Sequence, residues 1–171
     1  MFNLNRILVP VDFSACSRAA LDYAAFVARP FHASIDVLHV WEPPRPLWWE
    51  GVYPIDSGET QRLVAFESSE AGREMKAFLR HLEEDEGLCT RGRLESGDPY
   101  RTILAVARDD RYDLLVMGTH GRTGMSHLIL GSLAEAVVRR APCPVVTVRT
   151  TDPPLAWRAK HDPAHLKEAT P

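Results

Sequence analysis

The sequence predicts an α/β fold in which a doubly wound, five-stranded parallel sheet of order 3-2-1-4-5 carries helices on both faces. Three observations support this prediction. Five short apolar runs alternate with helical patterns along the chain, as they do in doubly wound sheets. The runs at residues 7–9 and 114–117 are apolar throughout, which is typical of strands buried on both faces. The chain has 171 residues, of which 45% are hydrophobic, and this suffices for one domain with a sizeable core.

Turn and capping residues delimit the elements. Either Ser14 or Ser17 can cap the first helix, and Pro30 ends it. Asp98 is the expected N-cap of the helix after the third strand, with Pro99 at its first position. The strands are expected at residues 6–12, 34–40, 89–95, 114–117 and 145–148, with a long helix at about 59–86.

Two segments depart from this regular pattern. Residues 41–58 contain four prolines and three tryptophans, which exclude regular structure there. Residues 151–171 have little apolar periodicity and are expected to be a disordered C-terminal tail. The predicted domain therefore spans residues 1–150, and no role is predicted for either segment.

The stretch at residues 114–144 carries most of the functional information. A buried strand runs into a loop rich in glycine, which can approach a ligand closely with its backbone. Ser132 is the expected N-cap of the following helix, and Glu135 completes a capping box. The unpaired N–H groups and the positive dipole end of such a helix favour an anion, most often a phosphate.

The spacing of the glycines decides which kind of phosphate site this is. Neither the P-loop pattern nor the dinucleotide pattern G-x-G-x-x-G occurs here. The pattern present is Gly118-x2-Gly121-x9-Gly131-Ser132. In the order 3-2-1-4-5, the first and fourth strands meet where the strand order reverses, and ligands of such sheets bind at that point. The residues alone thus predict a site for an anion of nucleotide size, without identifying the base.

The glycine spacing resembles the ATP-binding signature of the universal stress protein family. The resemblance covers about residues 5–149. It includes the opening strand at residues 7–14, the turn at residues 97–99 and the closing strand at residues 141–145. It implies a Rossmann-like fold of the adenine nucleotide alpha hydrolase type, with ATP, ADP or AMP as ligand and Mg²⁺ as an optional companion ion.

The resemblance also implies which positions bind the nucleotide. Pro10, Val11 and Asp12 are expected at the adenine and ribose, with Val40 beside the base. Met117, Gly118 and Gly121 would line the ribose and phosphates. The backbone amides and hydroxyl of Gly131, Ser132 and Leu133 would hold the phosphates.

Asp12 and several polar residues in or near the predicted site each allow two interpretations. The Asp12 carboxylate either caps the following helix, or accepts from a ribose hydroxyl or holds magnesium through water. His120, His127 and Arg122 either contact the phosphates or point into solvent. Cys16, near a helix N-terminus, is either a reactive thiol or an inert core residue.

Three functions are consistent with the sequence. The favoured one is a regulatory stress-response protein that acts through ATP occupancy or slow hydrolysis. The second is a kinase or efficient ATPase, although the loop offers only Arg122 as a permanent cation for phosphoryl transfer. The third is a nucleotide-independent interaction module.

Composition bears on location and partners. The net charge of −3 and the lack of a dense basic run argue against nucleic acid as a partner. No apolar stretch reaches the roughly 18 residues of a membrane span, and no signal peptide pattern opens the chain, so a cytoplasmic protein is expected. Three scattered cysteines favour neither a disulfide framework nor a zinc site.

The last strand predicts a homodimer. It would be an edge of the sheet, and its apolar residues make an unprotected edge that proteins normally pair or cover. The opposite edge, at residues 89–95, is polar. Pairing across a two-fold axis is the expected solution, and the resemblance implies dimers of this kind. The strand residues are Val145, Val146, Thr147 and Val148.

Overall fold

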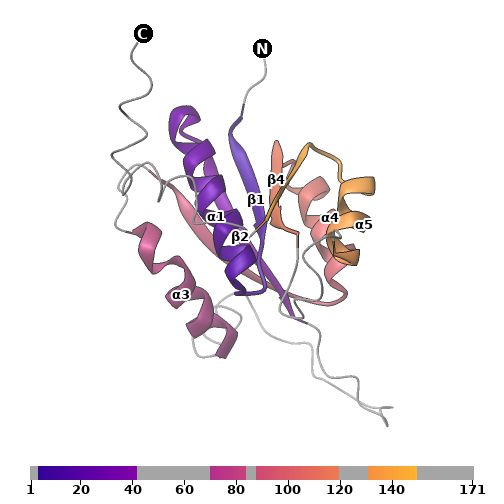
Figure 1. Cartoon of the computed structure of the whole chain (residues 1–171), viewed down its shortest axis with the longest axis horizontal. Coiled ribbons are helices and arrows are strands. Elements are labelled where there is room, and N and C mark those ends of the chain that lie inside the picture. The colour runs from indigo at the N-terminus through magenta and orange to yellow at the C-terminus, as the bar shows by residue number, and fades with distance from the viewer. Residues whose placement is uncertain (1–3, 42–69, 84–87, 120–130, 150–171) are drawn as a thin grey trace.

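The computed structural model describes residues 4–41, 70–83, 88–119 and 131–149, and these build a parallel sheet between two helical layers (Figure 1). The strand order is β3-β2-β1-β4-β5, which confirms the predicted fold class and order. The strands are β1 (Arg6–Pro10), β2 (Ser34–Trp41), β3 (Thr90–Ser96), β4 (Leu114–Gly118) and β5 (Val145–Val148).

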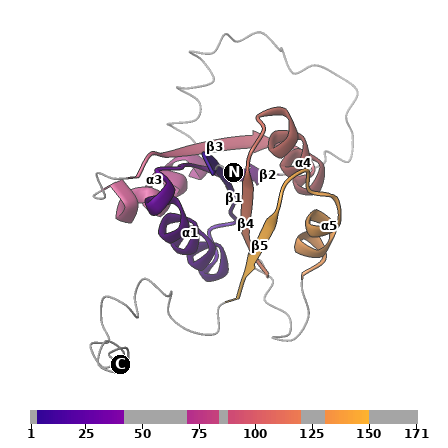
Figure 2. The same cartoon turned by 90° about the horizontal axis from the view of Figure 1, so that it is seen from above.

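The helices cover the two faces of the sheet in pairs. In Figure 2, α1 and α3 lie on one side of the sheet and α4 and α5 on the other. Their bounds are α1 (Ala15–Ala28), followed by the short 3₁₀ helix η1 (Arg29–Phe31), α3 (Glu70–Glu83), α4 (Pro99–Asp109) and α5 (Ser132–Arg140).

Burial on both faces explains why the strands are apolar throughout. Successive side chains of a strand point to opposite faces. Ile7 and Val9 of β1 therefore pack in the cluster under α1 and α3, whereas Leu8 packs in the cluster under α4 and α5. All three side chains are fully buried. No helix in the described part of the chain combines the length and apolar character needed to cross a bilayer.

Three of the four helix ends predicted from the sequence are confirmed. Ser14 caps α1, and its hydroxyl accepts from the Ser17 amide at 3.2 Å. Asp98 caps α4, accepting from the Arg101 amide at 2.8 Å, and Pro99 is the first helical residue. Pro30 lies in η1, directly after α1 ends. These confirmed ends need only local hydrogen bonds, which is why sequence patterns predict them.

The predicted capping box of α5 is wrong. Gly131 is the N-cap, and Ser132 is already the first helical residue. Because Ser132 has entered the helix, its side chain is not in the cap position that could accept from an amide further along. Glu135 instead accepts from Arg139, one turn later, at 2.8 Å.

Some strand and helix limits also differ from expectation. β1 ends at Pro10 rather than at residue 12, and β3 begins at Thr90 rather than at residue 89. β2 continues through Trp41, the first residue of the expected irregular loop. The rest of that loop lies outside the described residues, as do residues 59–69 and 84–86 of the expected long helix, the glycine loop at 120–130 and the C-terminal tail.

A buried cluster of charged side chains lies at the end of the sheet where the strands begin. Asp36 of β2 is 5% exposed and accepts from Arg6 at 2.9 Å, from Arg91 at 2.9 and 3.1 Å, and from the hydroxyl of Tyr112. Burial opposes ionisation of Asp36, but the hydroxyl and the two guanidinium groups outweigh it, so its pKa lies below the usual range. Burial, with the Asp36 hydrogen bond, raises the pKa of Tyr112 to about 12. This cluster stabilises the end of the sheet opposite the candidate site.

Candidate functional site

The candidate site lies at the carboxyl ends of β1 and β4. These strands are neighbours, with Ile7 paired to Leu114 and Leu8 to Leu115. The chain leaves β1 into α1 on one face of the sheet, whereas the segment after β4 returns as α5 on the other face (Figure 2). The strand order therefore reverses between β1 and β4, which is where doubly wound sheets bind their ligands.

A backbone hydrogen bond holds the start of α5 against the end of β4. The Gly131 amide donates to the Thr119 carbonyl at 2.8 Å, and the Thr119 amide donates to the Val148 carbonyl at 2.9 Å. Thr119, the residue after β4, is thus bonded both to the N-cap of α5 and to the end of β5. Since Gly131 has no side chain to accept from the first turn of α5, the leading amides of that helix are suited to an anion.

Gly118 lets the first turn of α1 approach the end of β4. A Cβ at Gly118 would lie 2.9 Å from Cys16 Sγ and 3.1 Å from the Cys16 carbonyl carbon. Cys16 is 4% exposed, and its thiol donates to the Val148 carbonyl at 3.3 Å. Glycine is therefore required here by helix packing, a reason that the sequence pattern did not supply. The burial of Cys16 favours its interpretation as a core residue.

The turn from β1 into α1 is held in an unusual backbone conformation. Asp12 Oδ1 accepts from the Ser14 amide at 3.1 Å, so the carboxylate supports the turn before α1, but the cap of that helix is Ser14 and not Asp12. Between them, Phe13 has φ of 63°, in the left-handed region that a bulky residue seldom adopts. Such strain persists only where the surroundings enforce it, and it is frequent at binding sites.

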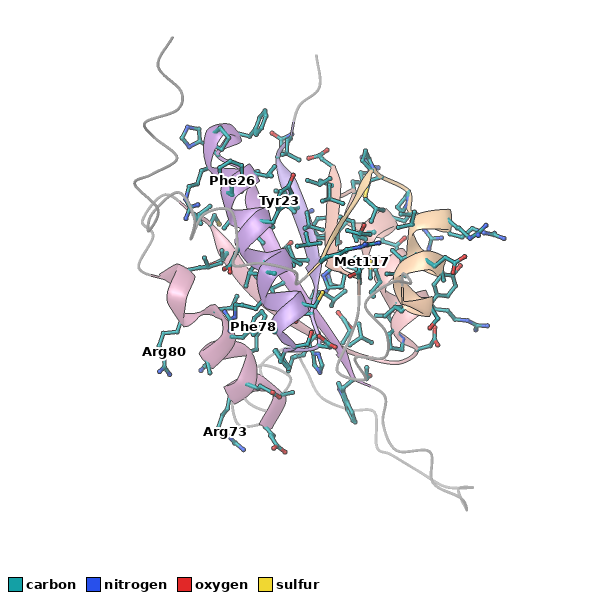
Figure 3. All side chains as sticks on the ribbon, in the orientation of Figure 1. Tyr23, Phe26, Arg73, Phe78, Arg80 and Met117 are labelled. Carbon is teal, nitrogen blue, oxygen red and sulfur yellow. The ribbon has the colours of Figure 1, made fainter. Side chains whose placement is uncertain are left out.

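His39 of β2 enforces this turn from the side. Its Nδ1 lies 2.8 Å from the Val11 carbonyl oxygen, and its ring lies against that of Phe13 with centroids 4.4 Å apart. Phe78 of α3 completes the aromatic group, 5.5 Å from Phe13 in an edge-on arrangement. In Figure 3, Phe78 lies between α3 and α1, whereas Arg73 and Arg80 project away from the body.

The predicted site residues are brought together only in part. Pro10, Val11 and Asp12 lie at the end of β1, and Met117 and Gly118 lie at the end of β4 beside it. Met117 is 5% exposed and packs in the core under α4 and α5, so its backbone rather than its side chain is available to a ligand (Figure 3). The remaining described positions are Val40 near the end of β2 and Gly131, Ser132 and Leu133 at the start of α5.

Other predicted positions remain untested. His120, Gly121 and Arg122 fall in the segment outside the described residues. Within the described ranges, no group of three or more His, Cys, Asp or Glu side chains is placed to hold a metal ion.

Sequence reasoning missed two residues that shape the site. Thr119 joins β4, β5 and α5 through its backbone, which a sequence pattern does not encode because any residue type can make these bonds. His39 was overlooked because it sits within an apolar strand. A polar residue at the carboxyl end of such a strand was the signal that could have indicated it.

The five-stranded parallel sheet, with helices on both faces and the start of α5 held where the strand order reverses, defines a doubly wound α/β protein. The chain belongs to the universal stress protein family, whose family model matches residues 3–149.

Individual relatives agree with this assignment. The chain is 31% identical over 146 residues to the universal stress protein MJ0531 of Methanocaldococcus jannaschii, covering 84% of this chain and 81% of that protein. It resembles the solved universal stress protein UspA of Lactobacillus plantarum with a TM-score of 0.67 and 26% identity, over 86% of this chain and 99% of the other. A universal stress protein of Archaeoglobus fulgidus, solved in complex with dAMP, has a TM-score of 0.58 at 19% identity, over 86% and 99% of the two chains. At that identity the likeness shows the fold alone.

Proposed function

We propose that this chain is a cytoplasmic universal stress protein that binds ATP at the carboxyl ends of β1 and β4 and has a regulatory role through nucleotide occupancy or slow hydrolysis. The observation that carries the proposal is the bond between Gly131 and Thr119, which fixes the leading amides of α5 beside the end of β4. A phosphate group at those amides would gain hydrogen bonds and favourable interaction with the helix dipole. The dAMP complex of the Archaeoglobus protein is a precedent for an adenine nucleotide on this fold.

The chain's own residues suit the parts of a nucleotide. The Asp12 carboxylate would accept from a ribose hydroxyl, and the backbone of Val40 would lie beside the base. The amides of Ser132 and Leu133 and the Ser132 hydroxyl would hold phosphates. Gly131, whose own amide already donates to the Thr119 carbonyl, would let the phosphates approach closely. Gly121, His120 and Arg122 of the glycine loop would lie next to them. A magnesium ion would bind mainly through the phosphates, and the carboxylate of Asp12, two residues after β1, could hold it through water.

A thermal-shift titration with ATP, ADP, AMP and GTP tests this proposal. A ligand at about 100 times its dissociation constant adds roughly 2.7 kcal/mol of stability. Adenine nucleotides should raise the melting temperature and GTP should raise it less. Absence of a shift with every adenine nucleotide would refute the proposal.

A pair of variants at the two ends of α5 locates the phosphates. Gly131→Val adds bulk at the N-cap, whose φ of −58° and ψ of 147° valine tolerates, so the fold should persist while phosphate binding is blocked. Ala141→Val is the matched control, since the C-cap has φ of −58° and ψ of 140° at the far end of the same helix. Normal ATP affinity in Gly131→Val would place the phosphates elsewhere.

Turnover distinguishes a regulatory protein from an enzyme. Efficient phosphoryl transfer requires a positioned base and several charges around the transferred group. We therefore expect ATP hydrolysis in the presence of Mg²⁺ to stay below about one turnover per second, the lower range of typical enzymes. A faster rate would favour the kinase or ATPase alternative. If a variant that cannot bind nucleotide still carried out the regulatory role of the wild type, the third alternative, a nucleotide-independent interaction module, would be favoured instead.

We further propose that two copies pair through β5. This strand contacts β4 on one side and forms an edge of the five-stranded sheet described here. The Pro144 carbonyl accepts from Leu115 of β4, and the Val148 carbonyl accepts from Thr119, the residue after β4. Since successive residues of a strand direct their backbone groups to opposite sides, those of Thr147 point to the open edge.

Sedimentation at micromolar concentration tests the dimer. We expect a species of twice the 19.2 kDa chain mass. Thr147→Pro should give the monomer because proline removes the outward N–H donor, whereas Thr147→Val should remain dimeric. A wild-type species near the chain mass would refute the dimer.

A further inference from the structure

The hydrogen-bond ladder between β1 and β2 stops abruptly at the candidate site. Its register ends with Pro10 opposite Leu38, and its last bond runs from the Val11 amide to the Leu38 carbonyl at 2.8 Å. In a parallel pair, the bonds alternate evenly from strand to strand. The next one would run from the Val40 amide to the Val11 carbonyl, and it would pair Val11 with His39.

The side chain of His39 occupies the acceptor of that missing bond. Its Nδ1 lies 2.8 Å from the Val11 carbonyl oxygen. A carbonyl oxygen only accepts, so Nδ1 must carry the hydrogen and donate. The ring is held in this position by Phe13, whose ring centroid lies 4.4 Å away. The imidazole therefore replaces the Val40 amide as the partner of Val11.

This replacement leaves the backbone of Val40 facing the site. Val40 still pairs with Glu95 of β3 on its other side. On the β1 side, no strand among the described residues continues the ladder to Val40. The side chain of Val40 is half-buried and packs toward α4 and α5, so the backbone is fixed in place. A fixed amide and carbonyl at the end of a strand form a donor and acceptor pair of defined geometry.

We propose that His39 is a positioning residue that ends the β1–β2 ladder one pair early and thereby reserves the Val40 backbone edge for the base of a nucleotide. The part that names the base rests on the proposed function, whereas the part about the ladder does not. An N–H donor beside a C=O acceptor matches adenine, which presents the N1 acceptor beside the N6 amino donor. With the base held in the same orientation, guanine would set its N1–H donor against the Val40 amide and its O6 acceptor against the Val40 carbonyl, so both hydrogen bonds would be lost and guanine disfavoured.

Two substitutions of nearly equal shape separate the hydrogen bond from the packing of the ring. His39→Asn keeps an N–H donor close to the position of Nδ1, whereas His39→Leu keeps similar bulk and cannot donate. Both lose the ring that lies against Phe13, so any effect of that loss is common to the two. A difference between the two variants in amide exchange or in nucleotide affinity therefore reports the hydrogen bond to the Val11 carbonyl.

Hydrogen exchange of the Val40 amide, followed by NMR in the full nucleotide-free chain, tests the ladder. In wild type and His39→Asn the amide should exchange quickly. In His39→Leu the Val11 carbonyl loses its donor, and the Val40 amide is expected to take its place because a buried carbonyl tends to be paired. Its exchange should slow by about tenfold, the factor that corresponds to about 1.4 kcal/mol. Equal exchange in the Leu and Asn variants would overturn the proposal.

Nucleotide affinity tests the consequence for the base. His39→Leu should weaken ATP binding by about tenfold and reduce the preference for ATP over GTP, while His39→Asn should bind nearly as wild type does. Equal losses in both variants would show that the ring acts by packing, and would overturn the positioning role. If the wild-type chain bound no adenine nucleotide, the proposed function would fail. The exchange experiment would then decide the ladder part of the inference by itself.

Discussion

Gly118→Ala offers a direct test of how tightly the candidate site is packed. The new methyl carbon would lie 2.9 Å from Cys16 Sγ, 3.1 Å from the Cys16 carbonyl carbon and 3.2 Å from its Cβ. Real Cβ atoms do not sustain the first of these distances, so either Cys16 or the end of β4 must move. Cys16 has little room because it is buried and bonded to the Val148 carbonyl.

The size of the effect follows from overpacking. Extra methyl groups in a well-packed core cost about 1–3 kcal/mol. For a protein of this size, about 1 kcal/mol lowers the melting temperature by roughly 2–4 °C. Gly118→Ala should therefore lower it by roughly 2–12 °C. The new methyl group fills the space of the thiol, so removal of the thiol should relieve much of the cost.

A double-mutant cycle measured by chemical denaturation checks this reasoning. Cys16→Ala alone should be mildly destabilising, by about 1 kcal/mol, because it removes a weak hydrogen bond and leaves a small cavity. The double variant should be more stable than the sum of the single effects by about 1 kcal/mol or more. Additive losses, or an unchanged melting temperature for Gly118→Ala, would show that the two residues are not in close contact.

The remaining predictions concern the opposite end of the sheet and the helix caps. Asp36→Asn should cost about 1–3 kcal/mol at pH 7, less than the loss of a fully buried pair, because Arg91 is 63% exposed. Since the folded pKa of Asp36 is depressed, its stabilisation is present above the unfolded pKa of about 4 and fades as the pH falls further, so denaturation curves of variant and wild type should converge in acid. The pKa of Tyr112 is raised to about 12, so its contribution is complete below the unfolded value of about 10 and declines as the pH rises toward 12; Tyr112→Phe should remove this alkaline dependence. Asp98→Ala should cost about 1 kcal/mol as the loss of an N-cap, whereas Ser132→Ala should leave the stability of the nucleotide-free chain nearly unchanged, and equal losses would restore Ser132 as the cap.

The order of elements could be predicted from the sequence because each element carries its own local pattern. The continuous apolar run at residues 114–117 indicates burial on both faces before any neighbour is known. Asp98 followed by Pro99 marks a helix start through bonds within one turn. The alternation of such elements restricts the sheet to a few topologies, and the observed order is among them.

The same local reasoning failed where the chain geometry depends on distant contacts. Ser132 and Glu135 match a capping box, yet the N-cap of α5 is Gly131, one residue before Ser132. There the amide of Gly131 bonds the carbonyl of Thr119, which leaves Gly131 in the cap position. A pattern of residue types does not record a backbone bond between β4 and the start of α5.

The sequence by itself determined the fold class and restricted the strand order to a few topologies, because burial and capping act over a few residues. Only the tertiary structure decided why Gly118 must be glycine and which donor pairs with the Val11 carbonyl. Cys16 approaches Gly118 from 102 positions earlier in the chain, and His39 reaches Val11 from a neighbouring strand. Such contacts exist only after the sheet and its helices have packed, so the site is defined by the folded geometry.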